Sequence, residues 1–206
     1  GNFDWIKNRK RQPLLNEPDQ SYGGAIWADA VPQLTGANIP FVIRLRVVLL
    51  RDTGAPLAPF NAWQIIQGLE TVGLRMKQHC SNAEKVVTFL ETQKKVKNVI
   101  YPTNHQGEIK ERALKYMKGG YGSLVGMDVG TKENGAKFIN NLKMLYHVAN
   151  IGDARSLAIH PATTTHSQLN DEELLAAGVT PGYVRLSIGI EHPDDIVADI
   201  KQALAA

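Results

Sequence analysis

The chain has one cysteine, few aromatic residues and almost no excess charge of either sign. Aromatic side chains make up 7% of its 206 residues, and 23 Lys and Arg stand against 20 Asp and Glu. A single cysteine, Cys80, excludes an internal disulfide framework and a cysteine-based zinc cage. It fits a reducing compartment, so we expect a cytoplasmic protein. The net charge of +3 is too small to indicate a nucleic-acid partner.

Long apolar runs and the common catalytic motifs are missing as well. The longest apolar run is far shorter than the ~20 residues of a membrane-spanning helix, and no charged-then-apolar leader opens the sequence, so we expect no membrane partner. There is no glycine-rich phosphate loop, no Gly-x-Ser-x-Gly elbow and no His-Glu-x-x-His motif. Only two histidines, His160 and His166, lie close in sequence, and their spacing fits no known ligand pattern. We therefore predict structural histidines and no metal site.

The first sixty residues are expected to form an irregular arm. Prolines at 13, 18, 32, 40, 56 and 59 interrupt this stretch, and residues 17–24 are rich in turn-forming types. Within it, the apolar run over residues 41–50 fits either a buried strand or a helix. An arm of this length is our candidate for reaching a neighbouring subunit.

A long helix is predicted to follow from Pro59. Pro59 suits its first turn, and Gly68 and Gly73 are points where it could bend. A helix of this length commonly links two substructures, so we place a domain boundary near Arg75, between residues 1–75 and 76–206. Apolar residues recur along it at spacings of three or four: Trp63, Ile66, Leu69, Val72, Met76, Cys80, Ala83, Val87 and Leu90.

Strands and helices alternate in the rest of the chain, which predicts an α/β fold with helices covering a sheet. Asn170 and Glu173 form a capping box that opens a short helix ending at Gly178. In residues 184–190 apolar and other side chains alternate, as in a strand with one buried face. The remaining expected strands are 98–101 and 123–129, and the remaining helices are 109–117, 134–145 and one from Asp194 onward.

Two features carry candidate chemistry. Residues 152–166 form a polar stretch of small and hydroxylated residues that includes Ser156. Such a loop either cradles a small anion or merely connects two strands. Arg185 lies on a strand whose other face is apolar. Its guanidinium either lies in solvent or in a structural ion pair, or binds a carboxylate. The pattern alone leaves these alternatives open.

Several short segments, taken in order, match one known set of enzymes. They are residues 1–5 (GNFDW), 49–55 (LLRDTGA), 59–63 (PFNAW), 68–71 (GLET), 74–76 (LRM), 149–154 (ANIGDA), 156–157 (SL), 160–162 (HPA) and 184–191 (VRLSIGIE). Together they resemble the Cys/Met-metabolism family of pyridoxal-phosphate (PLP) enzymes. The likeness covers essentially the whole chain, and the opening arm resembles the O-acetylhomoserine sulfhydrylase branch more than the γ-lyases.

The resemblance implies the C-terminal part of a fold-type I PLP transferase. Residues 1–75 would close the large PLP-binding domain with an arm and the start of a bridging helix, and residues 76–206 would form the small domain. The resemblance implies that Arg185 binds the α-carboxylate of the substrate, with Ser156 and Leu157 beside it. The implied reaction converts O-acetyl-L-homoserine and sulfide to L-homocysteine and acetate, in a homotetramer.

The same resemblance implies that half of the enzyme is missing. The Schiff-base lysine of the family lies in a Ser-x-Thr-Lys motif, which is expected upstream of Gly1, so this chain would hold no catalytic and no cofactor-binding residue. The first residue is Gly1 rather than Met, which fits a processed, tagged or truncated product. Its partners would then be the N-terminal half of the same enzyme, the PLP held there, the amino-acid substrate and sulfide. The alternatives are a cystathionine γ-synthase, a methionine γ-lyase, or a non-catalytic fragment.

Overall fold

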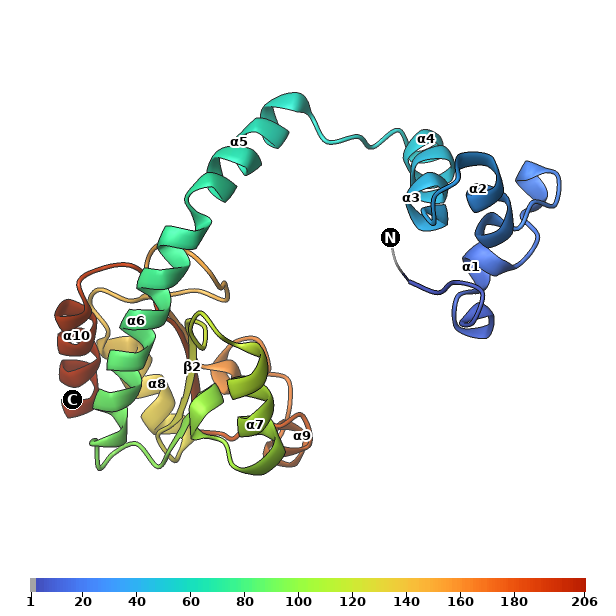
Figure 1. Cartoon of the computed structure of the whole chain (residues 1–206). Coiled ribbons are helices and arrows are strands. Elements are labelled where there is room, and N and C mark those ends of the chain that lie inside the picture. The colour runs from blue at the N-terminus through green and yellow to red at the C-terminus, as the bar shows by residue number, and fades with distance from the viewer. Residues whose placement is uncertain (1–2) are drawn as a thin grey trace. The chain divides into compact units, whose positions relative to one another are not determined.

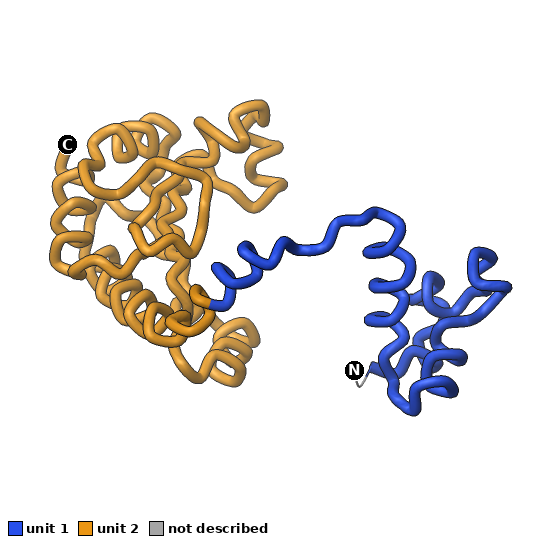
Figure 2. Tube along the Cα trace, turned by 90° about the horizontal axis from the view of Figure 1, so that it is seen from above, with its two compact units in different colours: residues 1–66 blue, residues 67–206 orange. Residues whose placement is uncertain are grey.

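The computed structural model describes residues 3–206, which form two compact units. One unit ends at Ile66 and the other begins at Gln67 (Figure 2). The first is helical, and the second contains a sheet. The first two residues of the GNFDW segment, Gly1 and Asn2, lie outside the described residues.

The first unit is built of short helices around a small core (Figure 1). Leu15, Trp27 and Val31 are buried at its centre. The indole of Trp27 also donates a hydrogen bond of 2.9 Å to the carboxylate of Asp19. Its elements are η1 (Arg9–Arg11), α1 (Pro13–Asn16), η2 (Gln20–Tyr22), α2 (Trp27–Thr35), α3 (Pro40–Arg44), η3 (Leu45–Leu50) and α4 (Arg51–Thr53).

The expectation of an irregular arm is therefore wrong for most of this stretch. Pro13 and Pro40 occupy the first positions of α1 and α3, where the missing backbone N–H of proline costs no hydrogen bond. These prolines begin helices rather than interrupt them. The apolar run over residues 41–50 is helical, because α3, η3 and α4 follow one another without a break.

No single helix among residues 3–206 has both the length and the apolar composition of a membrane span. One pair of helical segments, Trp27–Thr35 and Pro40–Thr53, meets that criterion jointly, with a bend of 101° between them.

The predicted long helix is confirmed, with one interruption. Helix α5 (Pro59–Glu70) begins at the expected proline, and α6 (Val72–Glu91) follows after the single residue Thr71. The break falls between Gly68 and Gly73, where the sequence is weakest as a helix. The two compact units divide between Ile66 and Gln67, inside the same helical stretch. The assignment of residues 1–75 and 76–206 to two enzyme domains stays a prediction.

The second unit contains one mixed sheet of five strands in the order β1-β2-β5-β4-β3. All neighbouring strands are antiparallel except β3 and β4, which are parallel. The strands are β1 (Asn98–Ile100), β2 (Leu124–Asp128), β3 (Tyr146–His147), β4 (Leu157–Ile159) and β5 (Tyr183–Ser187). The α/β fold class is confirmed.

Helices cover the two faces of this sheet unequally. Helices α6, α8 (Lys132–Asn141) and α10 (Pro193–Ala205) bury the main core against one face, which includes Val125, Val184 and Leu186. Helix α7 (Gly107–Tyr116) lies on the other side of β2 (Figure 1). Shorter segments are η4 (Pro102–Asn104), η5 (Pro161–Thr163) and α9 (Asp171–Ala176), which has the predicted capping box of Asn170 and Glu173.

Two of the differences from the sequence expectation have a clear physical cause. Residues 157–159 were expected in a connecting loop, but they form β4 and are fully buried, since three small or apolar residues are too few to show a strand pattern. Helix α8 ends at Asn141, not at residue 145. The buried carboxylate of Asp199 accepts hydrogen bonds from the backbone amides of Lys143, Met144 and Leu145, and so draws this segment out of the helix.

Candidate carboxylate-binding site

Arg185 lies in the middle of β5, at the centre of the sheet. Its Cα pairs with Gly126 of β2 on one side and with Ile159 of β4 on the other. Its chain neighbours Val184 and Leu186 are fully buried in the core. Because successive side chains of a strand point to opposite faces, Arg185 projects from the face that carries α7. The predicted strand is confirmed as far as Ser187, three residues short of its expected end, and Ser187 on the Arg185 face is buried as well.

A cavity of about 500 Å³ lies on this face, and Arg185 forms part of its wall. The walls are mainly apolar and come from α7 and from the strands β1 and β2. Its aliphatic lining residues include Ile100, Ile109, Met117 and Leu124, and none of the lining residues is acidic. A charge on such a wall interacts more strongly with a ligand than the same charge in water, because less solvent screens it.

The guanidinium of Arg185 has no partner among residues 3–206. No carboxylate lies within salt-bridge distance of it. Arg112, which also lines the cavity, pairs with Glu108 one turn earlier on α7. The ion-pair alternative for Arg185 therefore has no support in the described part of the chain. The planar fork of Arg185 has the geometry to bind a carboxylate through two parallel hydrogen bonds.

Leu157 opens the neighbouring strand β4, and Ser156 directly precedes it. Leu157 pairs with Ser187, so Leu157 and Arg185 belong to the same face of the sheet. Ser156 is fully buried, and the carboxylate of Glu191 accepts hydrogen bonds from its amide at 2.6 Å and from its hydroxyl at 2.9 Å. The same hydroxyl accepts a bond of 2.8 Å from the amide of Gly189. The polar groups of Ser156 thus fix the chain beyond the end of β5.

Sequence reasoning missed the residues that hold this segment to α6. On α6, the ring nitrogen Nδ1 of His79 lies 2.6 Å from the carbonyl oxygen of Ile188. Asn82 donates hydrogen bonds from Nδ2 to the carbonyls of Gly189 and Glu191, at 3.0 and 2.8 Å. Both side chains are buried. The sequence signal that could have revealed them is a pair of polar residues, three positions apart, beside the apolar stripe of the helix. A buried polar group requires a hydrogen-bond partner.

His160 is a structural residue, as predicted. Its ring nitrogens lie 2.9 Å from the Thr163 hydroxyl and 2.8 Å from the carbonyl of Pro181. Burial lowers the pKa of His160, so the neutral ring is favoured. Within residues 3–206, no cluster of three potential metal-ligating side chains was found.

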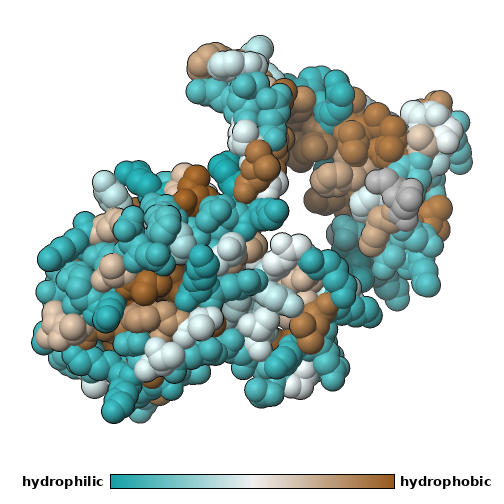
Figure 3. Space-filling model, turned by 60° about the vertical axis from the view of Figure 1, so that its left-hand side comes forward, coloured by the Kyte–Doolittle hydropathy of each residue, from teal (hydrophilic) through white to brown (hydrophobic). Residues whose placement is uncertain are grey.

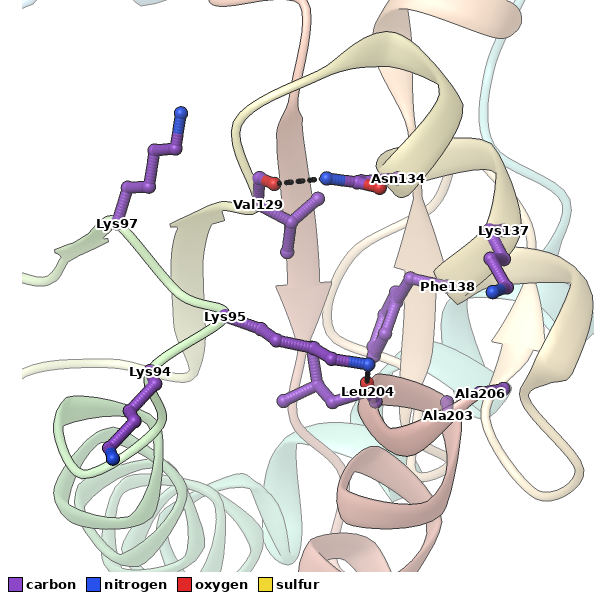
Figure 4. A pocket seen from close by; sticks show the side chains of 10 residues that line it. All are labelled: Lys94, Lys95, Lys97, Val129, Asn134, Lys137, Phe138, Ala203, Leu204 and Ala206. Carbon is purple, nitrogen blue, oxygen red and sulfur yellow. Dashed lines mark hydrogen bonds between the residues drawn. The ribbon is translucent and has the colours of Figure 1, made fainter.

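The lysines of the described chain do not fit a covalent PLP site. Such a site needs a lysine for the Schiff base and an acidic or arginine partner for the pyridine nitrogen, in an enclosed pocket. A cavity of about 290 Å³ is lined by Lys94, Lys95, Lys97 and Lys137 (Figure 4), and all four are exposed. No acidic side chain lines it.

One lysine of this cavity, Lys95, already has a hydrogen-bond partner. The ammonium of Lys95 donates a hydrogen bond of 2.6 Å to the carbonyl oxygen of Leu204, at the end of α10 (Figure 4). Elsewhere in residues 3–206, no lysine is buried. This cavity therefore has neither a buried lysine nor an acidic side chain to hold PLP.

Comparison with known proteins identifies the family. The model of the Cys/Met metabolism PLP-dependent enzymes matches residues 19–205. The O-acetyl-L-homoserine sulfhydrylase of Leptospira meyeri is 45% identical over 209 residues, covering 99% of this chain and 47% of that protein. The homocysteine synthase of Schizosaccharomyces pombe is 42% identical over 205 residues, with 99% and 47% covered.

A solved structure shows the same fold. A putative O-acetylhomoserine (thiol)-lyase of Campylobacter jejuni, which carries a pyridoxyl-lysine phosphate, matches with a TM-score of 0.82 and 41% identity, covering 98% of this chain and 47% of the other. The chain thus spans about half the length of the relatives that it matches. Taken with the matched sheet and bridging helix, these likenesses show that the chain belongs to the Cys/Met-metabolism family of PLP-dependent enzymes.

Proposed function

We propose that this chain supplies the substrate-carboxylate site of an O-acetylhomoserine sulfhydrylase, which forms L-homocysteine and acetate from O-acetyl-L-homoserine and sulfide. The names of the relatives support the reaction class. The observation that carries the site is the guanidinium of Arg185, which has no protein partner in residues 3–206 and lines a largely apolar cavity. A ligand with a carboxylate and an uncharged side chain complements such a wall.

In this proposal Arg185 binds and orients the amino acid. Two charge-assisted hydrogen bonds fix both oxygens of the α-carboxylate, and this restricts the directions in which the bonds at Cα point. Leu157, at the start of β4, and Ser156, which precedes it, belong to the neighbouring chain segment. Because Glu191 and Gly189 engage the polar groups of Ser156, Ser156 acts by positioning the segment that follows β5.

The proposal places PLP and its lysine in a second half of the enzyme that joins this chain. Residues 1–75 would then belong to the PLP-binding large domain and residues 76–206 to the small domain, in a cytoplasmic homotetramer. The apolar stripe of the bridging helix supports this division. Its later members, such as Ala83 and Leu90, are buried, but Trp63, Ile66 and Leu69 are 55%, 53% and 60% exposed.

The first test joins the chain to the part of the Leptospira meyeri relative that it does not match, by co-expression or by fusion. The combined protein is expected to bind PLP and to release homocysteine, measured by thiol detection after sulfide removal. The 206-residue chain alone, mixed with PLP, is expected to show no absorption band of a protonated Schiff base. Borohydride should label its exposed lysines sparsely and without preference, and one stoichiometrically labelled lysine would contradict the proposal.

A second prediction concerns the exposed part of the helical stripe. Apolar side chains appear as brown patches on the surfaces of both units (Figure 3). Exposed apolar patches of this kind bind hydrophobic dyes. The double substitution of Ile66 and Leu69 by Lys is expected to reduce the fluorescence of a bound naphthalene-sulfonate dye, whereas Gln67→Lys, an exposed polar position on the same helix, serves as the charge control. Equal dye fluorescence in the wild type, the double variant and Gln67→Lys would contradict the idea that this stripe is an apolar surface left uncovered by the second half of the enzyme.

A further inference from the structure

Tyr183 lies beside Arg185 on the cavity side of the sheet. The two residues are two positions apart on β5, so their side chains leave the same face. The ring of Tyr183 does not stand above its own strand partner, Asp128, but leans along β2 toward Gly126. A Cβ atom placed on Gly126 would lie 2.7 Å from Cε2 of Tyr183 and 3.1 Å from its hydroxyl oxygen.

Gly126 is also the strand partner of Arg185. The tip of the phenol therefore ends next to the base of the Arg185 side chain, on the floor of the cavity. A residue with any side chain at 126 would displace the ring, because the space that its Cβ needs is already occupied. Diagonal neighbours on a sheet are within the reach of aromatic side chains, which is the relation seen between Tyr183 and Gly126.

The charge of Arg185 acts on the hydroxyl of Tyr183. Burial raises the pKa of Tyr183, and the positive charge of Arg185 opposes this rise. The phenol consequently stays protonated, and able to donate, at neutral pH. Another tyrosine of the cavity, Tyr101, donates its hydroxyl hydrogen to the carbonyl of Gly122 at 2.9 Å. The Tyr183 hydroxyl forms no such bond within the described residues.

A carboxylate bound in this cavity needs more donors than Arg185 supplies. Each carboxylate has about four lone-pair positions, and a guanidinium fork fills two of them. Where a ligand covers apolar walls and displaces water, the lone pairs that remain unpaired are costly. A phenolic O–H on the same wall as Arg185 can fill one of these positions.

We propose that Tyr183 is a second carboxylate-binding residue, which donates its hydroxyl hydrogen to the same ligand carboxylate that Arg185 binds. Glycine at position 126 leaves the space in which the phenol lies. This proposal rests on the proposed function, since both assign the carboxylate of an amino acid to this cavity. It adds a residue that selects for a carboxylate over a neutral group at the same place.

The test measures binding of L-norleucine to the 206-residue chain by NMR titration, with L-norleucinamide as the ligand that lacks the carboxylate. Tyr183→Phe is expected to weaken norleucine binding roughly tenfold, the loss of one hydrogen bond to a charged acceptor. Gly126→Ala is expected to weaken binding at least as much, by displacing the ring. Tyr146→Phe, an exposed tyrosine outside the cavity, should leave the dissociation constant unchanged. Thermal unfolding of each variant checks that the fold is retained.

The outcomes separate the two proposals. Wild-type affinity in Tyr183→Phe, together with lost affinity in Arg185→Gln, would overturn the role of Tyr183 and leave the Arg185 site standing. Unchanged affinity in Arg185→Gln, equal affinity for the amide, or no binding by the wild-type chain would overturn both. A loss in Tyr183→Phe and Gly126→Ala that is confined to the carboxylate ligand supports the proposal.

Discussion

Truncation of Arg185 to alanine is expected to remove on the order of 2–5 kcal/mol of transition-state stabilisation from kcat/KM in the combined enzyme, because the substrate carboxylate would be desolvated without a partner. The kcat/KM of Arg185→Lys should lie between those of the wild type and Arg185→Ala. Lysine keeps the charge, but its ammonium lacks the planar fork that binds both oxygens. Steady-state kinetics with O-acetyl-L-homoserine and sulfide measure both effects.

The control for Arg185 is a cation outside the cavity. Lys201 is exposed on α10, and Lys201→Ala should leave kcat/KM unchanged. PLP absorption should be the same in all variants, since the proposal places the cofactor in the other half of the enzyme. If Arg185→Ala loses only thermal stability and retains wild-type kcat/KM, Arg185 is a structural residue and the carboxylate assignment is wrong.

Replacement of Asp199 by alanine is expected to destabilise the α/β unit strongly. Its carboxylate is 6% exposed and accepts three backbone hydrogen bonds, from Lys143, Met144 and Leu145, plus one from Gln202. Without it three amides lose their acceptor, which costs on the order of 3 kcal/mol or more of unfolding free energy. Urea unfolding followed by circular dichroism measures the loss, and the exposed Asp195 on the same helix gives the control variant Asp195→Ala.

The same carboxylate predicts a pH dependence. Burial by itself raises the pKa of Asp199, but the backbone hydrogen bonds from Leu145, Lys143 and Met144 outweigh it and hold the pKa below its ordinary value of 3.8. A carboxyl group with a depressed folded-state pKa stabilises the fold fully above its unfolded pKa and loses that contribution as the pH falls through the folded value. The stability difference between wild type and Asp199→Ala should therefore shrink below about pH 4. A difference that stays constant down to pH 2 would contradict this account.

The elements that could be predicted from sequence are those whose signal is local. The alternation around Arg185, the capping box of Asn170 and the stripe from Trp63 to Leu90 each depend on a residue and its near neighbours, and each was confirmed in the structure. The prediction of an irregular arm in the first unit was wrong because a proline at the start of a helix and a proline in a loop look alike in sequence. Pro13 and Pro40 are of the first kind.

The parts of the site that escaped prediction depend on contacts between distant segments. Whether Arg185 has an acidic partner is decided by which strands lie beside β5, and the sequence does not state the strand order. The lean of Tyr183 over Gly126 joins residues that are far apart along the chain, and so do the hydrogen bonds between Ser156 and Glu191. Such contacts become visible only when the sheet is assembled, as does the strand β4, which is too short to show a pattern.

The two buried hydrogen-bonding side chains of α6 have a mechanical consequence. His79 and Asn82 tie the helix to the carbonyls of residues 188, 189 and 191, directly beyond the strand that carries Arg185. Helix α6 cannot slide or turn against β5 without breaking these bonds inside the core, so helix and strand move as one rigid body. We therefore expect any bending of the helical stretch that begins at Pro59 to occur at Thr71, between α5 and α6, and to leave Arg185 in its place relative to α6.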